Sequence, residues 1–152
     1  LKRVLGEEAL DALLEMRRAK ILSLLREICG VAKGKPVSVR FSPDPLFQGD
    51  KTALAWDDVK KAVDAVTLTF FGAGADDMAA QLRGIPRPNE RPVPVYGGFV
   101  FHHPDCQSEQ TFRDRLALVE EAGLDGVIFY SLSMATGMHL DWLKRAPRAP
   151  AA

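Results

Sequence analysis

The sequence has little of what marks several common classes of protein. It has only two cysteines, Cys29 and Cys106, which lie far apart and form neither a disulfide framework nor a cysteine metal motif. A disulfide between these two remains an open alternative. No apolar run reaches the roughly 18 to 20 residues that a membrane span needs. Lys plus Arg number 20, as do Asp plus Glu, and this balance excludes the concentrated basic surface that binds nucleic acid or an anionic membrane.

Several catalytic and cofactor motifs are missing as well. The segment "FFGAGADD" has two glycines after an apolar run, but it is neither a G-x-G-x-x-G nor a Walker sequence. The serines of "YSLS" lack the G-x-S-x-G elbow of a serine hydrolase. We therefore expect no cofactor and no bound metal. The chain begins at Leu1 without an initiator methionine, which favours a processed or partial chain.

What the sequence does contain is a regular alternation of helical and strand patterns. Apolar residues at three- and four-residue steps predict amphipathic helices, and short β-branched and aromatic runs predict strands that are apolar on both faces. Prolines and glycines separate these segments. The expected helices are 7–32, 56–63, 75–85, 109–122 and 139–146, and the expected strands lie within 35–44, 63–74, 93–102 and 124–133.

This alternation predicts an α/β fold with parallel strands joined by helical crossovers. We expect one domain over residues 1–146 and a disordered tail over 147–152. A full β/α barrel takes about 250 residues, or roughly 30 for each strand–helix unit, so four units make half a barrel. A doubly wound sheet with helices on both faces is the alternative, although the first strand here leads into "SPDPLFQGDK", which is not a phosphate loop.

Four segments carry a resemblance to a known family. "MRRAKILSLLREICGVAKGKPVSVRFSPDP", "VDAVTLTFFG", "RPVPVYGGFVFH" and "AGLDGVIFYSLS" resemble, in this order, the C-terminal half of glycoside-hydrolase-like β/α barrels of bacteria. The resemblance covers roughly residues 10 to 143. It implies that strands five to eight of a barrel are present and that the chain acts on or binds a carbohydrate. It also implies a catalytic carboxylate on the fourth strand, outside this chain. The third strand here ends in "HHPD", where a glutamate would be expected.

The candidate site lies where the predicted strands end, because the chemistry of β/α barrels takes place at the carboxyl ends of the strands. Glycoside hydrolysis needs two carboxylates, aromatic rings stack on sugar rings, and arginine and histidine hydrogen-bond to hydroxyl groups. We therefore assign the candidate catalytic residues as Asp44 and Asp105, and the candidate substrate-binding residues as Arg40, Phe71, His102, His103 and Tyr130.

Each of these assignments has an alternative. Asp44, between two prolines, and Asp105, after Pro104, are also typical turn residues. Adjacent strand residues point to opposite faces, so only one of His102 and His103 is expected to face the site. A metal-dependent hydrolase that uses both histidines and Asp105 is therefore a weaker hypothesis.

Two further points stay open at the level of sequence. The chain is either part of a carbohydrate-active enzyme or a carbohydrate-binding or assembly module without catalysis. Four parallel strands leave two open edges, so we also expect a partner, which is either the missing N-terminal half-barrel or a second copy of this chain.

Overall fold

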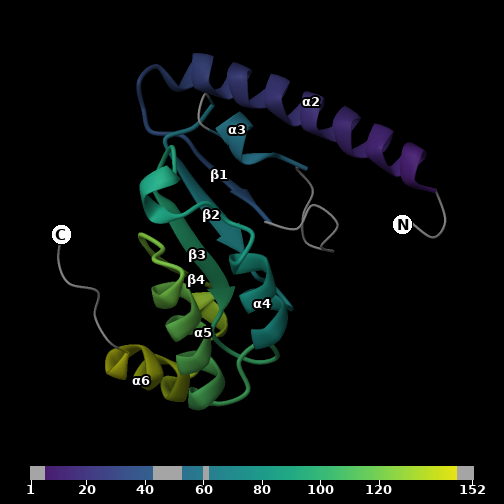
Figure 1. Cartoon of the computed structure of the whole chain (residues 1–152). Helices are drawn as coiled ribbons and strands as arrows, with labels where there is room; N and C mark the ends of the chain where they lie inside the picture. Colours follow the sequence, from purple (N-terminus) through teal and green to yellow (C-terminus); the bar gives the residue numbers. More distant parts are fainter. Residues whose placement is uncertain (1–5, 43–52, 60–61, 147–152) are drawn as a thin grey trace.

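The computed structural model describes residues 6–42, 53–59 and 62–146, and it confirms the predicted alternation of helices and strands (Figure 1). The strands are β1 (Ser38–Phe41), β2 (Ala65–Thr69), β3 (Val95–Val100) and β4 (Gly126–Tyr130). The helices are α2 (Glu7–Ala32), α3 (Trp56–Val59), α4 (Ala75–Leu82), α5 (Glu109–Glu121) and α6 (Gly137–Arg145), with short 3-10 turns η1 (Pro88–Glu90) and η2 (Leu132–Met134).

Two details of the prediction are wrong. The helix predicted over 56–63 ends at Val59, and neither Ala62 nor Val63 is helical. The turns η1 and η2 occupy segments predicted as loop and as strand. The expected tail over 147–152 lies outside the described residues.

The four strands form one parallel sheet in the order β1-β2-β3-β4, as the α/β prediction requires. The register aligns Arg40 with Thr67, Thr67 with Tyr96, and Tyr96 with Gly126 across the sheet. Because aligned residues of parallel strands point to the same side, this row of side chains lies on one face. The neighbouring row, which includes Val39, Val66 and Val95, points to the other face.

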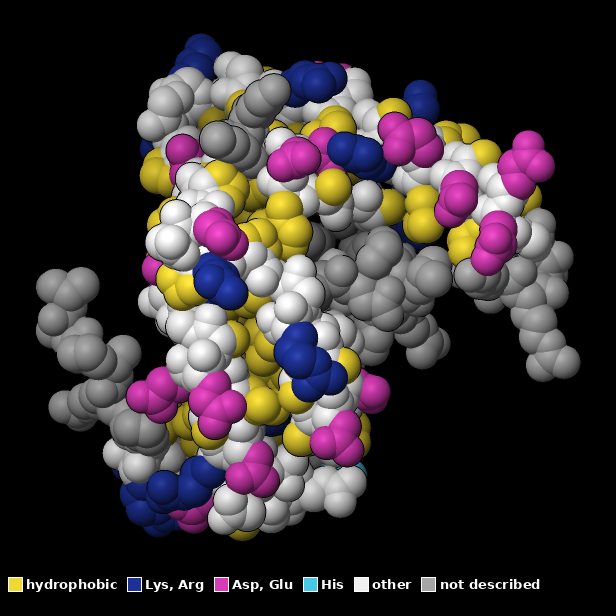
Figure 2. Space-filling view, viewed as in Figure 1, with side chains coloured by type: hydrophobic (Ala, Val, Ile, Leu, Met, Phe, Trp, Pro, Cys, Tyr) yellow, Lys and Arg dark blue, Asp and Glu magenta, His cyan; other side chains and the backbone are white. Residues whose placement is uncertain are grey.

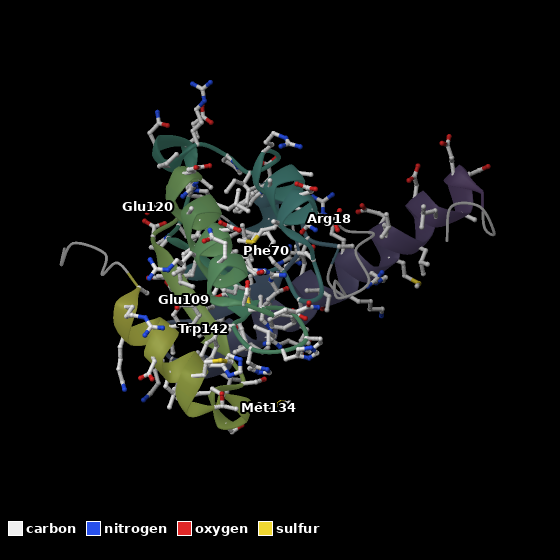
Figure 3. All side chains as sticks on the ribbon, turned by 90° about the horizontal axis from the view of Figure 1, so that it is seen from below. Arg18, Phe70, Glu109, Glu120, Met134 and Trp142 are labelled. Atoms are coloured by element: carbon white, nitrogen blue, oxygen red, sulfur yellow. The ribbon has the colours of Figure 1, made fainter. Side chains whose placement is uncertain are left out.

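The hydrophobic core lies between one face of the sheet and the helices. Phe70, Phe99 and Phe101 are fully buried there, and Figure 3 labels Phe70 and Trp142 of this core. Each α-helix contributes to the same cluster, through Leu25 of α2, Val59 of α3, Met78 and Leu82 of α4, Phe112 and Val119 of α5 and Trp142 of α6. Helices on one face of a sheet whose strands follow chain order are consistent with a partial barrel.

The opposite face of the sheet carries more polar side chains. It bears Thr67, Thr69, Tyr96 and Tyr130, and at Gly98 it has no side chain. The sequence predicted strands that are buried on both faces. That prediction is wrong for β4, where Ile128 is 37% exposed. β4 is an edge strand of the described sheet. The helices of the described part of the chain pack into the core on the other face and do not cover this one.

Two aspartates repeat one interaction at the amino ends of the strands. Asp64 precedes β2, accepts a hydrogen bond from the Val37 N–H at 2.7 Å, and donates its own N–H to the Val37 carbonyl. Asp125 precedes β4 and makes the same two contacts with Val95. These aspartates therefore fix the pairing of β1 with β2 and of β3 with β4 at the amino ends of the strands.

A bidentate ion pair joins α2 to α3. The Arg18 guanidinium donates to both carboxylate oxygens of Asp58 at 2.6 and 2.9 Å, and the N–H of Ala55 donates to Asp58 as well. These hydrogen bonds, led by that from Arg18, lower the pKa of the Asp58 carboxyl group below its usual range although burial opposes the shift. Arg18 therefore holds the long helix α2 against the loop that enters α3.

The surface carries mixed charge. On the face that Figure 2 shows, basic and acidic side chains are interspersed with apolar ones and form no large patch of one sign. In the described part of the chain, no helix is both long enough and apolar enough to cross a bilayer.

Candidate functional site

Three of the predicted substrate-binding residues meet at the carboxyl ends of the strands. The guanidinium carbon of Arg40, on β1, lies 5.3 Å from the ring centre of Tyr130, which ends β4, and 5.9 Å from that of Phe71, which follows β2. The rings of Phe71 and Tyr130 contact each other edge to face at 4.7 Å. These side chains come from three strands and converge over the face opposite the helices. We call them the Arg40 cluster.

Gly98 makes room for this cluster. A Cβ atom on Gly98 would lie 2.8 Å from Cε2 of Tyr130 and 3.0 Å from Cγ2 of Thr67, which is closer than carbon atoms pack. Its neighbour Gly97 faces the core, where a Cβ atom would lie 2.9 Å from Val119. The sequence reasoning did not assign Gly98 to the site, although a glycine pair inside a strand is a signal of close approach.

Asp105 ties two of the site loops together. Its Oδ2 atom accepts a hydrogen bond from the Gly72 N–H at 2.8 Å, and Gly72 directly follows Phe71. One carboxylate oxygen of this candidate catalytic residue is therefore bound to the backbone, whereas the side chain as a whole is half-buried. The other candidate, Asp44, lies outside the described residues, so the distance between the two carboxylates stays untested.

The two adjacent histidines differ in exposure. His102 is 4% exposed and His103 is exposed. Nδ1 of His102 lies 2.7 Å from the carbonyl oxygen of His103. Because a carbonyl only accepts, this nitrogen is the donor, and in a neutral ring Nε2 is then the acceptor. That Nε2 atom is buried and has no hydrogen-bond partner in the described part of the chain.

His139 lies beside His102 and has a structural role near the start of α6. Its Nδ1 atom accepts the N–H of Thr136 at 3.1 Å and lies 2.9 Å from the Thr136 hydroxyl, so it caps α6. The two imidazole rings are 6.1 Å apart, and His139 packs edge-on against Trp142 at 4.7 Å. His139 therefore holds the end of α6 next to the loop that carries the histidine pair.

A buried arginine that the sequence did not single out supports these loops from the core side. Arg115 of α5 is 2% exposed, donates to the carbonyl oxygen of Ala73, and lies over the ring of Phe99 at 5.8 Å. Nearby, burial raises the pKa of the Cys106 thiol to about 11, and its Sγ atom donates to the Val100 carbonyl. Both Cys106 and Cys29 are free, so the disulfide alternative is wrong.

No group of three or more His, Cys, Asp or Glu side chains that suits a metal ion occurs within residues 6–42, 53–59 and 62–146. Three grooves of about 230 to 370 Å³ lie on the described surface. None of these three is lined by a residue of the Arg40 cluster. The strand ends therefore present two aromatic rings, Phe71 and Tyr130, beside the Arg40 guanidinium. They also carry the Asp105 carboxylate on a loop that is hydrogen-bonded to Gly72.

Comparison with known proteins gives one likeness. No protein-family model matches the chain, and no curated protein matches it. Among solved structures, the chain is similar to a protein from Bacteroides thetaiotaomicron described as a "putative alpha-L-fucosidase". The two chains are 14% identical, with a TM-score of 0.54, over 87% of this chain and 50% of the other. The likeness is one of fold. This chain spans half the length of that protein.

Proposed function

We propose that this chain forms strands five to eight of a TIM-type β/α barrel of the glycoside-hydrolase-like kind, and that it binds carbohydrate at the carboxyl ends of its strands. Three observations support the barrel. The strands follow chain order, the helices share one core on one face, and the match covers only 50% of the neighbour of similar fold. A doubly wound sheet instead carries helices on both faces and reverses its strand order.

The observation that carries the carbohydrate proposal is the Arg40 cluster. A sugar ring has apolar C–H faces that stack on aromatic rings, and hydroxyl groups that accept hydrogen bonds from a guanidinium. Phe71 and Tyr130 supply the rings, and Arg40 lies over both. The site lies at the end of the sheet where β/α barrels bind their substrates. The neighbour's description as an alpha-L-fucosidase agrees with a carbohydrate ligand.

For catalysis we propose Asp105 as one of the two carboxylates of a glycosidase. Its partner is Asp44, or a carboxylate of the unit that completes the barrel. The two carboxyl groups would need a separation of about 5 to 5.5 Å for retention or about 6.5 to 9.5 Å for inversion. His102 and His103 follow the same strand as Asp105, and we propose that they contribute hydrogen bonds to the bound sugar.

A non-catalytic binding module is the second candidate, and two observations favour it. One oxygen of Asp105 accepts the Gly72 N–H, a contact that gives this side chain a role in ordering the loops. His102 is buried at 4% exposure, below the surface that a ligand contacts. In such a module the Arg40 cluster binds sugar and Asp105 only orders the loops.

Sugar binding tests the proposed function directly. We expect Tyr130→Ala to weaken binding of methyl glycosides by about fivefold, because the loss of one aromatic contact costs about 1 kcal/mol. Saturation-transfer NMR with methyl fucoside, galactoside and glucoside measures this, and far-UV circular dichroism monitors the fold. Tyr96→Leu is the matched control, because Tyr96 lies on the same face near its amino end. If no glycoside binds the wild-type chain, the proposal fails.

We also propose a partner that closes the sheet, which is the missing N-terminal half-barrel or a second copy of this chain. Within residues 6–42, 53–59 and 62–146, β1 and β4 are the edge strands of the sheet, and edge strands present unpaired backbone groups. Apolar side chains are exposed beside both edges. They are Met16, Leu24, Ile28 and Val31 on α2, and Leu132, Met134, Met138 and Leu140 on η2 and α6. Rows of this kind favour burial against another protein surface.

Solution mass tests this partner. A single chain has a mass of 16.7 kDa, and we expect light scattering after size exclusion to give twice that value, or a complex with a second fragment. Met134→Glu with Met138→Glu should then release the monomer, whereas Glu120→Lys on the exposed surface of α5 should not. A wild-type monomer that binds no hydrophobic dye would contradict the proposal and favour a self-sufficient open sheet.

A further inference from the structure

Arg40 differs from the arginines that stabilise this fold. Arg18, Arg113 and Arg145 contact carboxylates, and Arg91 contacts carbonyl oxygens. Arg40 forms no ion pair and no hydrogen bond within residues 6–42, 53–59 and 62–146. In that part of the chain its guanidinium makes cation–π contacts with two aromatic rings. Its side chain is exposed, on the face of the sheet opposite the core. A permanent positive charge is therefore available to a ligand at this end of the sheet.

The aromatic contacts leave the hydrogen-bonding edge of Arg40 free. A cation–π contact uses the charge of the guanidinium and places no acceptor on its N–H groups. The five N–H donors of a guanidinium lie in its own plane. Phe71 and Tyr130 therefore lie on the same side of the guanidinium, at 5.9 and 5.3 Å and with their ring centres 4.7 Å apart, and they restrict it without satisfying its donors. A guanidinium restrained in this way loses less entropy when it binds an anion in bidentate fashion.

No carboxylate of the described residues forms an ion pair with this arginine. Asp105, on the site loops, accepts the Gly72 N–H on its Oδ2 atom at 2.8 Å. It forms no ion pair with Arg40, since no pair of the two lies within 4.0 Å in the described structure. The charge of Arg40 is thus not neutralised from within the described chain, and a ligand with its own anionic group gains the full contact.

We propose that the Arg40 cluster selects sugars that carry an anionic group, a carboxylate or a sulfate, and that Arg40 binds this group. The inference rests on the carbohydrate site proposed above and names its substrate class. The sugar ring stacks on the aromatic rings of the cluster while its acidic group takes the free N–H donors of Arg40. A neutral sugar leaves those donors to water and binds more weakly.

The test compares three ligands on the full 152-residue chain: methyl β-D-glucuronide, glucose 6-sulfate and methyl β-D-glucoside. We expect at least one of the acidic sugars to bind about tenfold more tightly than the glucoside, because charge-assisted bidentate bonds are about twice as strong as neutral ones. The two acidic ligands distinguish a carboxylate from a sulfate specificity. Adding 0.5 M NaCl should weaken the acidic ligands and leave the glucoside unchanged.

Variants assign the effect to Arg40. Arg40→Gln should lower the affinity for the acidic sugar to that for the glucoside, and Arg40→Lys should retain part of the preference. Arg83→Gln, at an exposed arginine that follows α4, should change neither affinity. Equal affinity for all three ligands would overturn this inference but would still support the carbohydrate site. The same holds if Arg83→Gln lowers the affinity for the acidic sugar as much as Arg40→Gln does. No binding of any sugar would overturn the proposed function and this inference together.

Discussion

Replacing Arg91 with methionine is expected to lower the free energy of unfolding by about 2 to 4 kcal/mol, the largest effect of a single polar substitution that we predict. The Arg91 side chain is 3% exposed. Its guanidinium donates to the carbonyl oxygens of Gly123 at 2.5 Å, Ala122 at 2.6 Å and Pro86 at 3.0 Å. Burial lowers the pKa of Arg91, and the charge of Asp125 opposes the shift.

The physical reason is that two of these carbonyls, those of Ala122 and Gly123, lie where α5 ends. The last carbonyls of a helix have no partner within it and carry partial negative charge, so a cation there contributes both hydrogen bonds and a favourable dipole interaction. Methionine fills a similar volume but offers no donor. The partly buried carbonyls of Ala122 and Pro86 would then lose their partners, which costs more than the bonds themselves contribute.

Urea denaturation followed by circular dichroism measures this loss. Arg83→Met is the matched control, because Arg83 is exposed, and it should change stability by less than about 0.5 kcal/mol. Arg91→Lys should be intermediate, since one ammonium group cannot reach three carbonyls. A loss below about 1 kcal/mol in Arg91→Met would mean that water replaces the guanidinium and that Arg91 does not secure the end of α5.

Gly98→Ala is expected to disrupt the Arg40 cluster and to lower the free energy of unfolding by about 1 to 3 kcal/mol. The new methyl group would meet the Tyr130 ring at 2.8 Å and the backbone oxygen of Leu68 at 3.2 Å. The strand backbone cannot yield without breaking its ladder, so the ring must move. Tyr130 then leaves its contacts with Phe71 and Arg40, and we expect sugar binding to weaken about as much as in Tyr130→Ala.

Gly97→Ala is the matched control, because the two glycines are adjacent and face opposite sides. A methyl group at Gly97 would approach the side chains of Val119 and Leu124, at 2.9 and 3.1 Å, in the core. We expect a similar loss of stability with sugar binding retained. NMR signals of the Tyr130 ring, together with a sugar titration, distinguish the two variants. Unchanged Tyr130 signals in Gly98→Ala would refute the role assigned to this glycine.

Much of the fold follows from local patterns that the sequence displays. The three- and four-residue steps of apolar residues in 7–32 predict α2, because only one face of a helix can be buried. The short apolar runs around Leu68, Phe99 and Ile128 predict β2, β3 and β4. Their alternation with helices implies a parallel sheet, since parallel strands need long crossovers. Asp64 and Asp125 directly precede β2 and β4, and each bonds there to the backbone at or just before the start of a neighbouring strand.

Other features depend on contacts between segments that lie far apart in the chain. Arg40 and Tyr130 are 90 positions apart in sequence, and nothing local predicts that a guanidinium on the first strand reaches a ring on the fourth. The glycine pair indicated a close approach, but only the register shows that Gly98 lies under Tyr130 and Gly97 against the core. The burial of His102 and exposure of His103 depend in the same way on how the loop after β3 packs beside α6.

The chain alone therefore determined which segments are helices and strands and that the strands run parallel, because hydrophobic periodicity and turn residues act over a few positions. Only the tertiary structure decided which face of the sheet the helices cover and which side chains meet at the strand ends. Those outcomes depend on strand order and register. A register shift by one residue would turn Arg40, Thr67 and Tyr130 to the opposite face, although every local pattern would stay the same.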